Sequence, residues 1–277
     1  MSLRFTKMHG IGNDFVVLDR RAATAPMSAE LARRLADRHV GVGCDQVMTI
    51  ERSDDAAAAF RYGIYNADGS VAGQCGNGLR CVVRWLAERG LVRGQGIRLI
   101  GPSGPVMADL LEDGRIRVDM GVPKFAAADV PLAIATSQPR YSLDLDGQRI
   151  DFGALSMGNP HAVIEVDDVA AAPVAALGAR IETHEVFPDR VNVGFAQVVD
   201  RGHVRLRVFE RGVGETLACG SGACAAVAVL RTWGRVDADV RVTLPGGDLQ
   251  ISWSGAGHPV WMTGPATIVF EGEWNDE

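Results

Sequence analysis

Gln74-Cys75-Gly76-Asn77-Gly78 and Ala218-Cys219-Gly220-Ser221-Gly222 are two short Cys-Gly-x-Gly stretches in equivalent places of a duplicated sequence. Residues 60–92 align with residues 204–236 at an offset of 144 without a gap, so that each cysteine and its two glycines meet their counterparts. Chance similarity between two glycine-rich stretches is a poor explanation for matches that keep their order and offset. The sequence therefore predicts two homologous domains related by a pseudo-twofold axis.

Weaker matches extend the repeat on both sides of these stretches. Gly12-Asn13 matches Gly158-Asn159 at an offset of 146, and Met120-x-x-Pro123 matches Met262-x-x-Pro265 at an offset of 142. Val42-Gly43-x-x-Gln46-Val47 matches Val193-Gly194-x-x-Gln197-Val198 at an offset of 151. We expect one domain over residues 1–119 plus 266–277 and the other over residues 120–265.

Each repeat shows a strand, a glycine-containing loop and then a helix. Residues 60–65 and 204–209 alternate and are rich in residues that favour strands. The first helix carries Leu79, Val82, Val83 and Leu86 on one face, and Arg89-Gly90 is a stop signal. The second helix, from Ala223 to Trp233, is apolar nearly all round, which is typical of a buried helix. Further strands are expected over 97–100, 105–111, 115–119, 161–166, 191–199, 240–244, 258–263 and 268–273, with weaker helices over 28–39 and 168–179.

These elements predict an α+β fold in which each domain is an antiparallel sheet or barrel wrapped around one central helix. The chain has 277 residues, of which 47% are hydrophobic, enough to bury two cores of this kind. Its net charge is −6 and its basic runs are short, so nucleic acids and membrane surfaces are not expected partners. The absence of a membrane-length apolar run and of a signal peptide favours a cytoplasmic protein.

The lysines, cysteines and histidines of the chain show no pattern typical of a cofactor or metal site. The chain holds only two lysines, Lys7 and Lys124, and neither lies in a stretch typical of a pyridoxal-phosphate site. Five cysteines without a Cys-x-x-Cys pair indicate free thiols, and the histidines show no metal-ligand spacing. We expect no cofactor and no metal.

A cysteine at a helix start is chemically favoured as an acid or base. The backbone N–H groups of the first turn bind anions, and the field there lowers a thiol pKa. The glycines that follow each cysteine are expected to let a ligand approach the backbone closely. If both helix starts face one substrate in a cleft between the domains, one thiolate can remove an α-proton while the other thiol delivers a proton to the opposite face. Such a pair inverts a stereocentre.

The other three cysteines lack these surroundings. Cys81 and Cys224 lie about one and a half turns into their helices and are interpreted as packing residues. Cys44 lies in a Gly-x-Gly-Cys-Asp loop and has no partner in the repeat, so packing or loop chemistry is expected for it rather than a place in the reactive pair.

Four motifs in order resemble the diaminopimelate epimerase family over nearly the whole chain. They are Met8-His9-Gly10-x-Gly12-Asn13-Asp14-Phe15, Asn66-Ala67-Asp68-Gly69-Ser70 with the first Cys-Gly stretch, Gly158-Asn159-Pro160-His161, and Glu210-Arg211-Gly212-x-Gly214-Glu215-Thr216 with the second. The resemblance implies interconversion of LL- and meso-2,6-diaminoheptanedioate without pyridoxal phosphate, on the route to lysine and peptidoglycan precursors. It also implies a homodimer, for which the strand over 268–273 is a candidate contact.

The resemblance further implies roles for individual residues. Cys75 and Cys219 are the expected acid/base pair, with His161 and Glu210 as aids to catalysis. The substrate-binding residues it implies are Asn13, Gln46, Asn66, Gly76, Asn77, Asn159, Asn192, Glu210, Arg211, Gly220 and Ser221. A substrate with two zwitterionic ends fits this set, because Arg211 suits a carboxylate, Glu210 suits an ammonium, and asparagine both donates and accepts.

Two alternatives stay open from the residues. A proline or hydroxyproline racemase or dehydratase of the same fold would also use two cysteines, although a small ring has no distal charged end for Arg211 to bind. A ligand-binding or redox-sensing protein would need only one reactive cysteine, and it offers no reason for the duplication.

Overall fold

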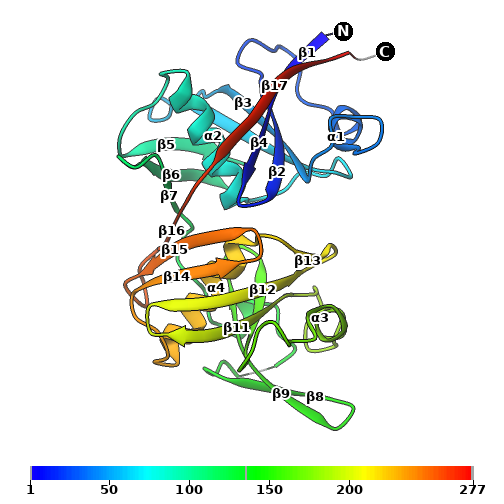
Figure 1. The fold of residues 1–277 in the computed structure, drawn as a ribbon, viewed down its shortest axis with the longest axis vertical. Coiled ribbons are helices and arrows are strands. Elements are labelled where there is room, and N and C mark those ends of the chain that lie inside the picture. The colour runs from blue at the N-terminus through cyan, green and yellow to red at the C-terminus, as the bar shows by residue number, and fades with distance from the viewer. Residues whose placement is uncertain (1, 135, 276–277) are drawn as a thin grey trace. The chain divides into compact units, whose positions relative to one another are not determined.

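The computed structural model describes residues 2–134 and 136–275, which divide into two compact units. Unit 1 comprises Met1–Asp119 and Thr263–Glu277, and unit 2 comprises Met120–Met262. The chain therefore passes from one unit to the other twice, and the last strand returns to unit 1 (Figure 1).

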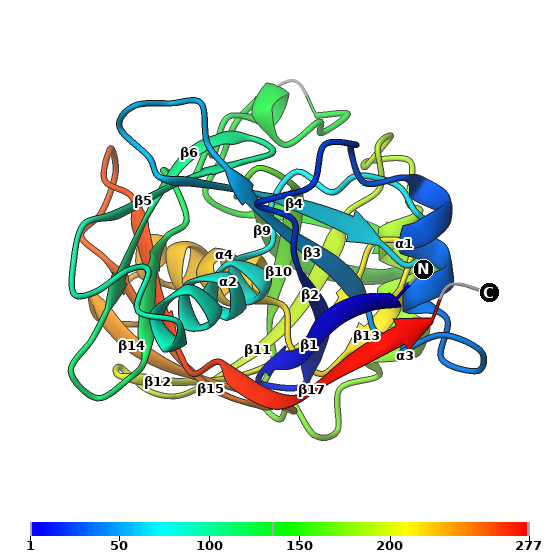
Figure 2. The same ribbon diagram turned by 90° about the horizontal axis from the view of Figure 1, so that it is seen from above.

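Unit 1 is a sheet with two helices. Its elements are β1 (Ser2–Gly10), β2 (Asn13–Asp19), α1 (Ala29–Ala36), β3 (Gln46–Arg52), β4 (Phe60–Asn66), α2 (Gly76–Glu88), β5 (Ile97–Gly101), β6 (Gly104–Leu110), β7 (Ile116–Asp119) and β17 (Thr267–Asn275). Strand β17 runs antiparallel to β1 along its length, so segments from the two ends of the sequence lie side by side (Figures 1 and 2).

Unit 2 repeats this plan with a few additions. Its elements are η1 (Ala127–Asp129), β8 (Tyr141–Leu145), β9 (Gln148–Ser156), β10 (Pro160–Glu165), α3 (Val174–Glu182), β11 (Asn192–Asp200), β12 (His203–Glu210), β13 (Gly214–Thr216), α4 (Gly220–Thr232), β14 (Asp239–Leu244) and β15 (Gly247–Trp253). Strand β16 (Val260–Gly264) carries the chain from unit 2 back into unit 1.

The order of strand pairings is the same in both units. From β1 to β6 the successive pairs are antiparallel, parallel, antiparallel, parallel and antiparallel. The series β9, β10, β11, β12, β14 and β15 repeats this pattern. The α+β class with two domains is confirmed, but the expectation of purely antiparallel sheets is wrong. Each parallel pair needs a crossover, and helices α1, α2, α3 and α4 provide the four crossovers.

The central helix of each unit packs against many strands of its own sheet. Helix α2 contacts β1, β2, β3, β6, β7 and β17, and α4 contacts β9, β10, β11, β12 and β15. The predicted face of α2 is buried, and in α4 every residue from Gly222 to Leu230 is buried, as its apolar sequence predicts. Both helices end in the predicted way, because Gly90 and Gly234 follow their last turns and donate back to carbonyls of those turns.

The outer helices are displaced from their predicted ranges for local reasons. Helix α1 ends at Ala36 rather than at 39, because the Asp37 side chain accepts from the N–H groups of His39 and Val40 and forms a turn there. Helix α3 covers 174–182 rather than 168–179, since Pro173 occupies its N-cap.

Strand register corrects one part of the repeat alignment. Gln46 pairs with Phe15 in unit 1, and Asn192 pairs with His161 in unit 2. On their other sides Gln46 pairs with Asn66, while Val193 pairs with Phe209, which sets Asn192 opposite Glu210. Gln46 therefore corresponds to Asn192 and not to Gln197. The offset of 151 was wrong because it aligned a Val-Gly pair from a loop with one from inside a strand.

No helix in 2–134 or 136–275 is long and apolar enough to cross a membrane. None of the five cysteines forms a disulfide, and Cys44, Cys81 and Cys224 are buried. Burial confirms the interpretation of Cys81 and Cys224 as packing residues and favours packing over loop chemistry for Cys44. Burial raises the pKa of Cys44 to about 12, so this thiol is protonated at neutral pH.

Candidate active site

Cys75 and Cys219 occupy the same position in the two units, the N-cap of the central helix. Both have extended backbone angles, with φ of −149° and −110° and ψ of 102° in each case. Gly76 and Gly220 are the first residues of α2 and α4, so their N–H groups belong to the first helical turn. Each unit therefore places a thiol at a helix end that favours negative charge.

The second glycine of each stretch, Gly78 or Gly222, serves packing rather than ligand access. A Cβ added to Gly78 would lie 2.8 Å from Sδ of Met48 and 3.1 Å from Cε1 of Phe15. A Cβ added to Gly222 would lie 3.1 Å from both Cys219 Sγ and Val208 Cγ2. The reading of these two glycines as openings for a ligand is wrong. They allow the helix start to rest directly on the sheet.

The first half-site is built around Asn13, which follows Gly12 in the β1–β2 turn. Gly12 has φ of 91°, a conformation that glycine adopts readily. Asn13 Oδ1 lies 3.8 Å from Cys75 Sγ and accepts from Asn77 Nδ2 at 3.3 Å. The N–H of Gly78 donates to Cys75 Sγ at 3.4 Å. The sulfur can thus accept one hydrogen bond and donate another, as a group that changes its protonation state must.

Gln46 and Asn66 form a second polar pair in unit 1. Gln46 Nε2 donates to Asn66 Oδ1 at 2.8 Å across the antiparallel β3–β4 pair, and Asn66 Nδ2 donates to Ser70 Oγ at 3.0 Å. Both residues lie at strand ends and are only partly buried. The pair offers a fixed set of amide groups to a polar ligand.

The second half-site is built around Asn159, the counterpart of Asn13. It follows Gly158, whose φ of 92° matches that of Gly12. Asn159 Oδ1 lies 3.0 Å from His161 Nε2, and Asn159 Nδ2 donates to Ser221 Oγ at 3.5 Å. Ser221 Oγ in turn lies 3.7 Å from Cys219 Sγ. A chain of polar groups therefore connects His161 to the second thiol.

Burial controls the charge of two groups in this half-site. Burial, together with the positive charge of Arg211, lowers the pKa of His161 to about 3, so the imidazole is neutral. Burial also raises the pKa of Cys219 well above its ordinary value, and the negative charge of Glu210 adds to the effect. In this conformation Cys219 is a protonated thiol, which is the form that a proton donor must have.

The β12–β13 turn carries the remaining predicted residues. Thr216 Oγ1 donates to Glu210 Oε1, and the Arg211 N–H donates to Asn192 Oδ1 at 3.0 Å. Asn192 Nδ2 donates to the Pro160 carbonyl at 2.9 Å. The Arg211 guanidinium donates to the Asp189 carbonyl at 3.1 Å. The turn is thus held from both sides, and its acidic and basic side chains follow one another.

Sequence reasoning missed three residues that hold these groups in place. Asp45 accepts from Asn13 Nδ2 at 2.8 Å, Thr216 holds Glu210, and Glu182 accepts from the Gly212 N–H at 2.7 Å. Asp45 directly precedes Gln46, and Thr216 lies inside a motif already singled out, so adjacency was an available signal for both. Glu182 lies in a helix remote in sequence from Gly212, and nothing in its surroundings pointed to the turn.

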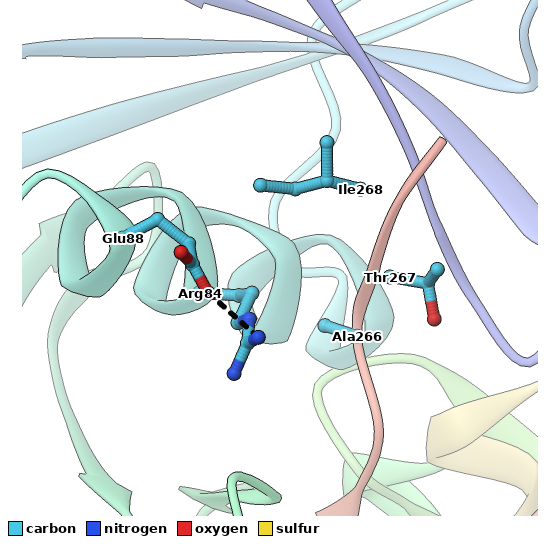
Figure 3. A pocket seen from close by; sticks show the side chains of 5 residues that line it. All are labelled: Arg84, Glu88, Ala266, Thr267 and Ile268. Atoms are coloured by element: carbon cyan, nitrogen blue, oxygen red, sulfur yellow. Dashed lines mark ion pairs between the residues drawn. The ribbon is translucent and has the colours of Figure 1, made fainter. Parts of the chain in front are cut away.

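A surface hollow of about 350 Å³ in unit 1 is separate from these groups. Figure 3 shows its lining, in which Arg84 and Glu88 of α2 form an ion pair of 2.6 Å beside Ala266, Thr267 and Ile268. None of the predicted site residues lines it, and we assign it no function.

Comparison with known proteins gives the family. The model of the family described as diaminopimelate epimerase matches residues 5–126 and 153–269. A diaminopimelate epimerase of Xanthomonas axonopodis pv. citri is 59% identical over 274 residues, covering 99% of this chain and 96% of the relative. One of Nitrosospira multiformis is 52% identical over 273 residues, covering 99% and 98%.

This chain belongs to the diaminopimelate epimerase family. The resemblance stated from the four motifs is confirmed, and with it the expected class of enzyme, an epimerase.

Solved structures of other protein families share the fold of this chain. A hydroxyproline epimerase from Agrobacterium vitis, with bound trans-4-hydroxy-L-proline, aligns with a TM-score of 0.71 at 18% identity, over 98% of this chain and 92% of that one. A phenazine biosynthesis protein of the PhzF family from Bacillus anthracis aligns with a TM-score of 0.69 at 16% identity over the whole of both chains. At these identities the likeness establishes the fold alone.

Proposed function

We propose that this protein interconverts LL- and meso-2,6-diaminoheptanedioate by proton transfer between its α-carbon and two thiols, Cys75 and Cys219. The observation that carries the proposal is the equivalence of the two cysteines. Each caps the central helix of a unit built in the same strand order. Each is also connected to an asparagine that follows a glycine of matching conformation, Cys75 directly to Asn13 and Cys219 to Asn159 through Ser221. A duplicated thiol is what a reaction on two faces of one carbon requires.

The chemical step balances without an oxidant or reductant. One sulfur, as thiolate, takes the α-proton, so that the C–H bond breaks and an S–H bond forms while the electron pair remains on the substrate. That pair delocalises into the α-carboxylate. The other sulfur, as thiol, gives its proton to the opposite face, which forms a C–H bond of inverted configuration. After one turnover the two sulfurs have exchanged protonation states, so both states must be accessible at working pH.

The two helix starts supply the electrostatic stabilisation in this proposal. The developing charge on the α-carboxylate needs hydrogen-bond donors already in place. We assign this role to the first-turn N–H groups of α2 and α4, at Gly76, Asn77, Gly220 and Ser221. The mechanism requires both helix starts to reach one substrate, so we place the substrate in a cleft between the two domains.

The distal end of the substrate is assigned to the β12–β13 turn and to the amide side chains of Gln46, Asn66 and Asn192. A distal ammonium and carboxylate need an acceptor and a donor together, which Glu210 and Arg211 provide as neighbours. Gln46, Asn66 and Asn192 add amide groups that both donate and accept. A proline ring has no such distal end, so these residues favour the diamino dicarboxylate over the proline-type alternative.

The test is α-proton exchange in D2O followed by NMR, with LL-diaminoheptanedioate and no added cofactor. Deuterium at one α-carbon together with meso product supports the proposal. Cys75→Ser and Cys219→Ser should each lower the rate about 10³-fold. Cys81→Ala, on the same helix but buried in packing, is the matched control and should stay near the wild-type rate. Exchange with proline alone would select the racemase alternative, and silence with both would leave a binding or sensing role.

Three further properties belong to the same proposal. We place the reaction in the cytoplasm, on the route to lysine and peptidoglycan precursors, with no cofactor. We also propose a homodimer, with β17 as its candidate contact because Val269 and Phe270 are exposed on this strand. Sedimentation of the wild type and of Val269→Glu tests this assignment. A dimer that the substitution leaves intact would exclude β17.

A further inference from the structure

We propose that Asp45 is a positioning residue whose carboxylate fixes the Asn13 amide with its oxygen facing Cys75. The inference rests on the proposed function and on the substrate-binding role that the family resemblance implies for Asn13. Asp45 would touch neither the substrate nor the thiol, and it would act entirely through Asn13.

The chemistry of the contact determines the orientation of the amide. Asp45 Oδ2 lies 2.8 Å from Asn13 Nδ2. A carboxylate only accepts hydrogen bonds, so the NH2 group of Asn13 must be the part that faces it. Oδ1 of Asn13 then points the other way, 3.8 Å from Cys75 Sγ and 3.3 Å from Asn77 Nδ2. The half-site therefore offers an acceptor beside its sulfur and no donor from this side chain.

Asp45 is itself held by a reciprocal set of bonds with Asp14. The Asp14 N–H donates to Asp45 Oδ2 at 3.1 Å, and the Asp45 N–H donates to Asp14 Oδ1 at 3.0 Å. Arg38 bridges the two carboxylates at 2.7 and 2.8 Å. Although burial alone would raise it, hydrogen bonds from Arg38 and Lys7 keep the pKa of Asp14 well below its ordinary value. These bonds hold the Asp45 carboxylate in place, and the Asp14 carboxylate beside it stays ionised at neutral pH.

Unit 2 orients its equivalent amide in the opposite sense. Asn159 turns Oδ1 toward His161 Nε2 and presents its NH2 group to Ser221 on the thiol side. By strand register, the position of Asp45 is taken by Val191 in unit 2, and the position of His161 is taken by Phe15 in unit 1. Each unit has a polar anchor where the other has a buried apolar side chain.

This difference gives the two half-sites opposite polarity. The Asn13 oxygen suits an N–H of the substrate α-ammonium, or the S–H of Cys75. The Asn159 NH2 group suits an oxygen or a negatively charged sulfur. A fixed difference of this kind would hold the α-ammonium on the side of unit 1 while the thiols exchange roles, which a freely rotating amide could not do.

A double-mutant cycle tests whether Asp45 acts through Asn13. We expect Asn13→Ala to lower kcat/KM about 100-fold and Asp45→Ala about 10-fold. The double variant should be no slower than Asn13→Ala, because the anchor has nothing left to hold. Losses that multiply in the double variant would mean that Asp45 acts independently of Asn13 and would overturn the proposal.

Two further variants separate positioning from a general loss of ion pairing. Asp45→Asn can still accept from Asn13 but loses its charge toward Arg38, so it should stay within about threefold of the wild type. Asp19→Ala is the matched control, since Asp19 pairs with Arg21 at 2.7 Å and has a side chain 40% exposed against 45% for Asp45. It should leave kcat/KM unchanged. Equal losses in Asp45→Asn and Asp45→Ala would assign the effect to the ion pair.

The rate at which iodoacetamide alkylates Cys75 can be measured without substrate, so it tests this inference separately from the proposed function. In Asp45→Ala the freed amide can turn its NH2 group to the sulfur and stabilise the thiolate, which is the form that reacts with iodoacetamide. Alkylation of Cys75 at neutral pH should then be about threefold faster than in the wild type, and Asp45→Asn should match the wild type. An unchanged rate would overturn the inference even in an active enzyme. Inactivity toward diaminoheptanedioate with a changed rate would overturn only the proposed function.

Discussion

His161 Nε2 and Asn159 Oδ1 lie 3.0 Å apart, and the imidazole that makes this contact is buried and neutral. Because a neutral imidazole with its proton on Nε2 donates one hydrogen bond, His161 holds Asn159 without carrying charge. We expect His161→Gln, which keeps an uncharged N–H donor, to retain most of kcat/KM. His161→Phe, the residue of the equivalent position in unit 1, should lose about 10-fold. Steady-state kinetics of both variants measures this, and equal loss in both would mean that the imidazole does more than donate.

The same imidazole makes unfolding depend on pH. Its folded pKa of about 3 lies below the ordinary value of 6.5, so the unfolded chain binds an extra proton between these values. Stability from this group is therefore complete above pH 6.5 and falls as pH drops toward 3, by at most about 1.4 kcal/mol per pH unit. Urea unfolding of wild type and His161→Phe at pH 7 and pH 5 measures the difference. A wild type that loses no more than the variant would contradict it.

The two thiols should differ in reactivity. Cys219 is 4% exposed and its pKa is raised by burial and by Glu210, whereas Cys75 is only partly buried. Without substrate, iodoacetamide should therefore label Cys75 first, followed by mass spectrometry of the peptides. Glu210→Gln removes a negative charge beside Cys219 and should therefore reduce the difference in labelling rate between Cys75 and Cys219. Faster labelling of Cys219 would show that the solution conformation differs from this one.

Close packing between α4 and the sheet makes one glycine of β9 hard to replace. A Cβ on Gly153 would lie 2.4 Å from Val229 Cγ1 and 2.9 Å from Trp233 Cζ2, and both side chains belong to the end of α4. We expect Gly153→Ala to lower the free energy of unfolding by about 1–3 kcal/mol. Gly194→Ala on β11 is the control, because its nearest neighbour would be Leu206 Cδ1 at 3.4 Å, an ordinary contact. Urea denaturation of both variants measures the difference, and equal stability would show that α4 shifts freely.

The central elements could be predicted because their signals are local. A cysteine before glycines, an apolar face and a terminal glycine are enough to define α2 and α4, and the structure keeps all three signals. The strands β2 and β3 were not predicted. Their sequences do not alternate cleanly, since residues 15–18 and 47–50 are buried without interruption. A strand covered on both faces has no period of two to detect.

Neither the strand order nor the role of Asp45 could be predicted from the sequence. Parallel pairing depends on which strands meet across a crossover, and this is decided by packing rather than by any one strand. Asp45 shows the same limit at the level of one side chain. A carboxylate in a glycine-containing loop is ordinary by itself, and its importance follows only from the 2.8 Å contact with Asn13. The misaligned Gln197 had the right residue type but the wrong register.

The pairing of β17 with β1 determines the order in which the units can be completed. Unit 2 is an uninterrupted stretch of chain, so all of its strands are available once synthesis has passed residue 262. Unit 1 must wait for β17, which pairs with β1 from Ser2 to His9 and follows unit 2 in the chain. A newly synthesised chain therefore exposes an unfinished edge on β1 until β17 has been made. A circular permutant that joins β17 to β1 and opens the chain after residue 119 would make both units continuous and remove this delay.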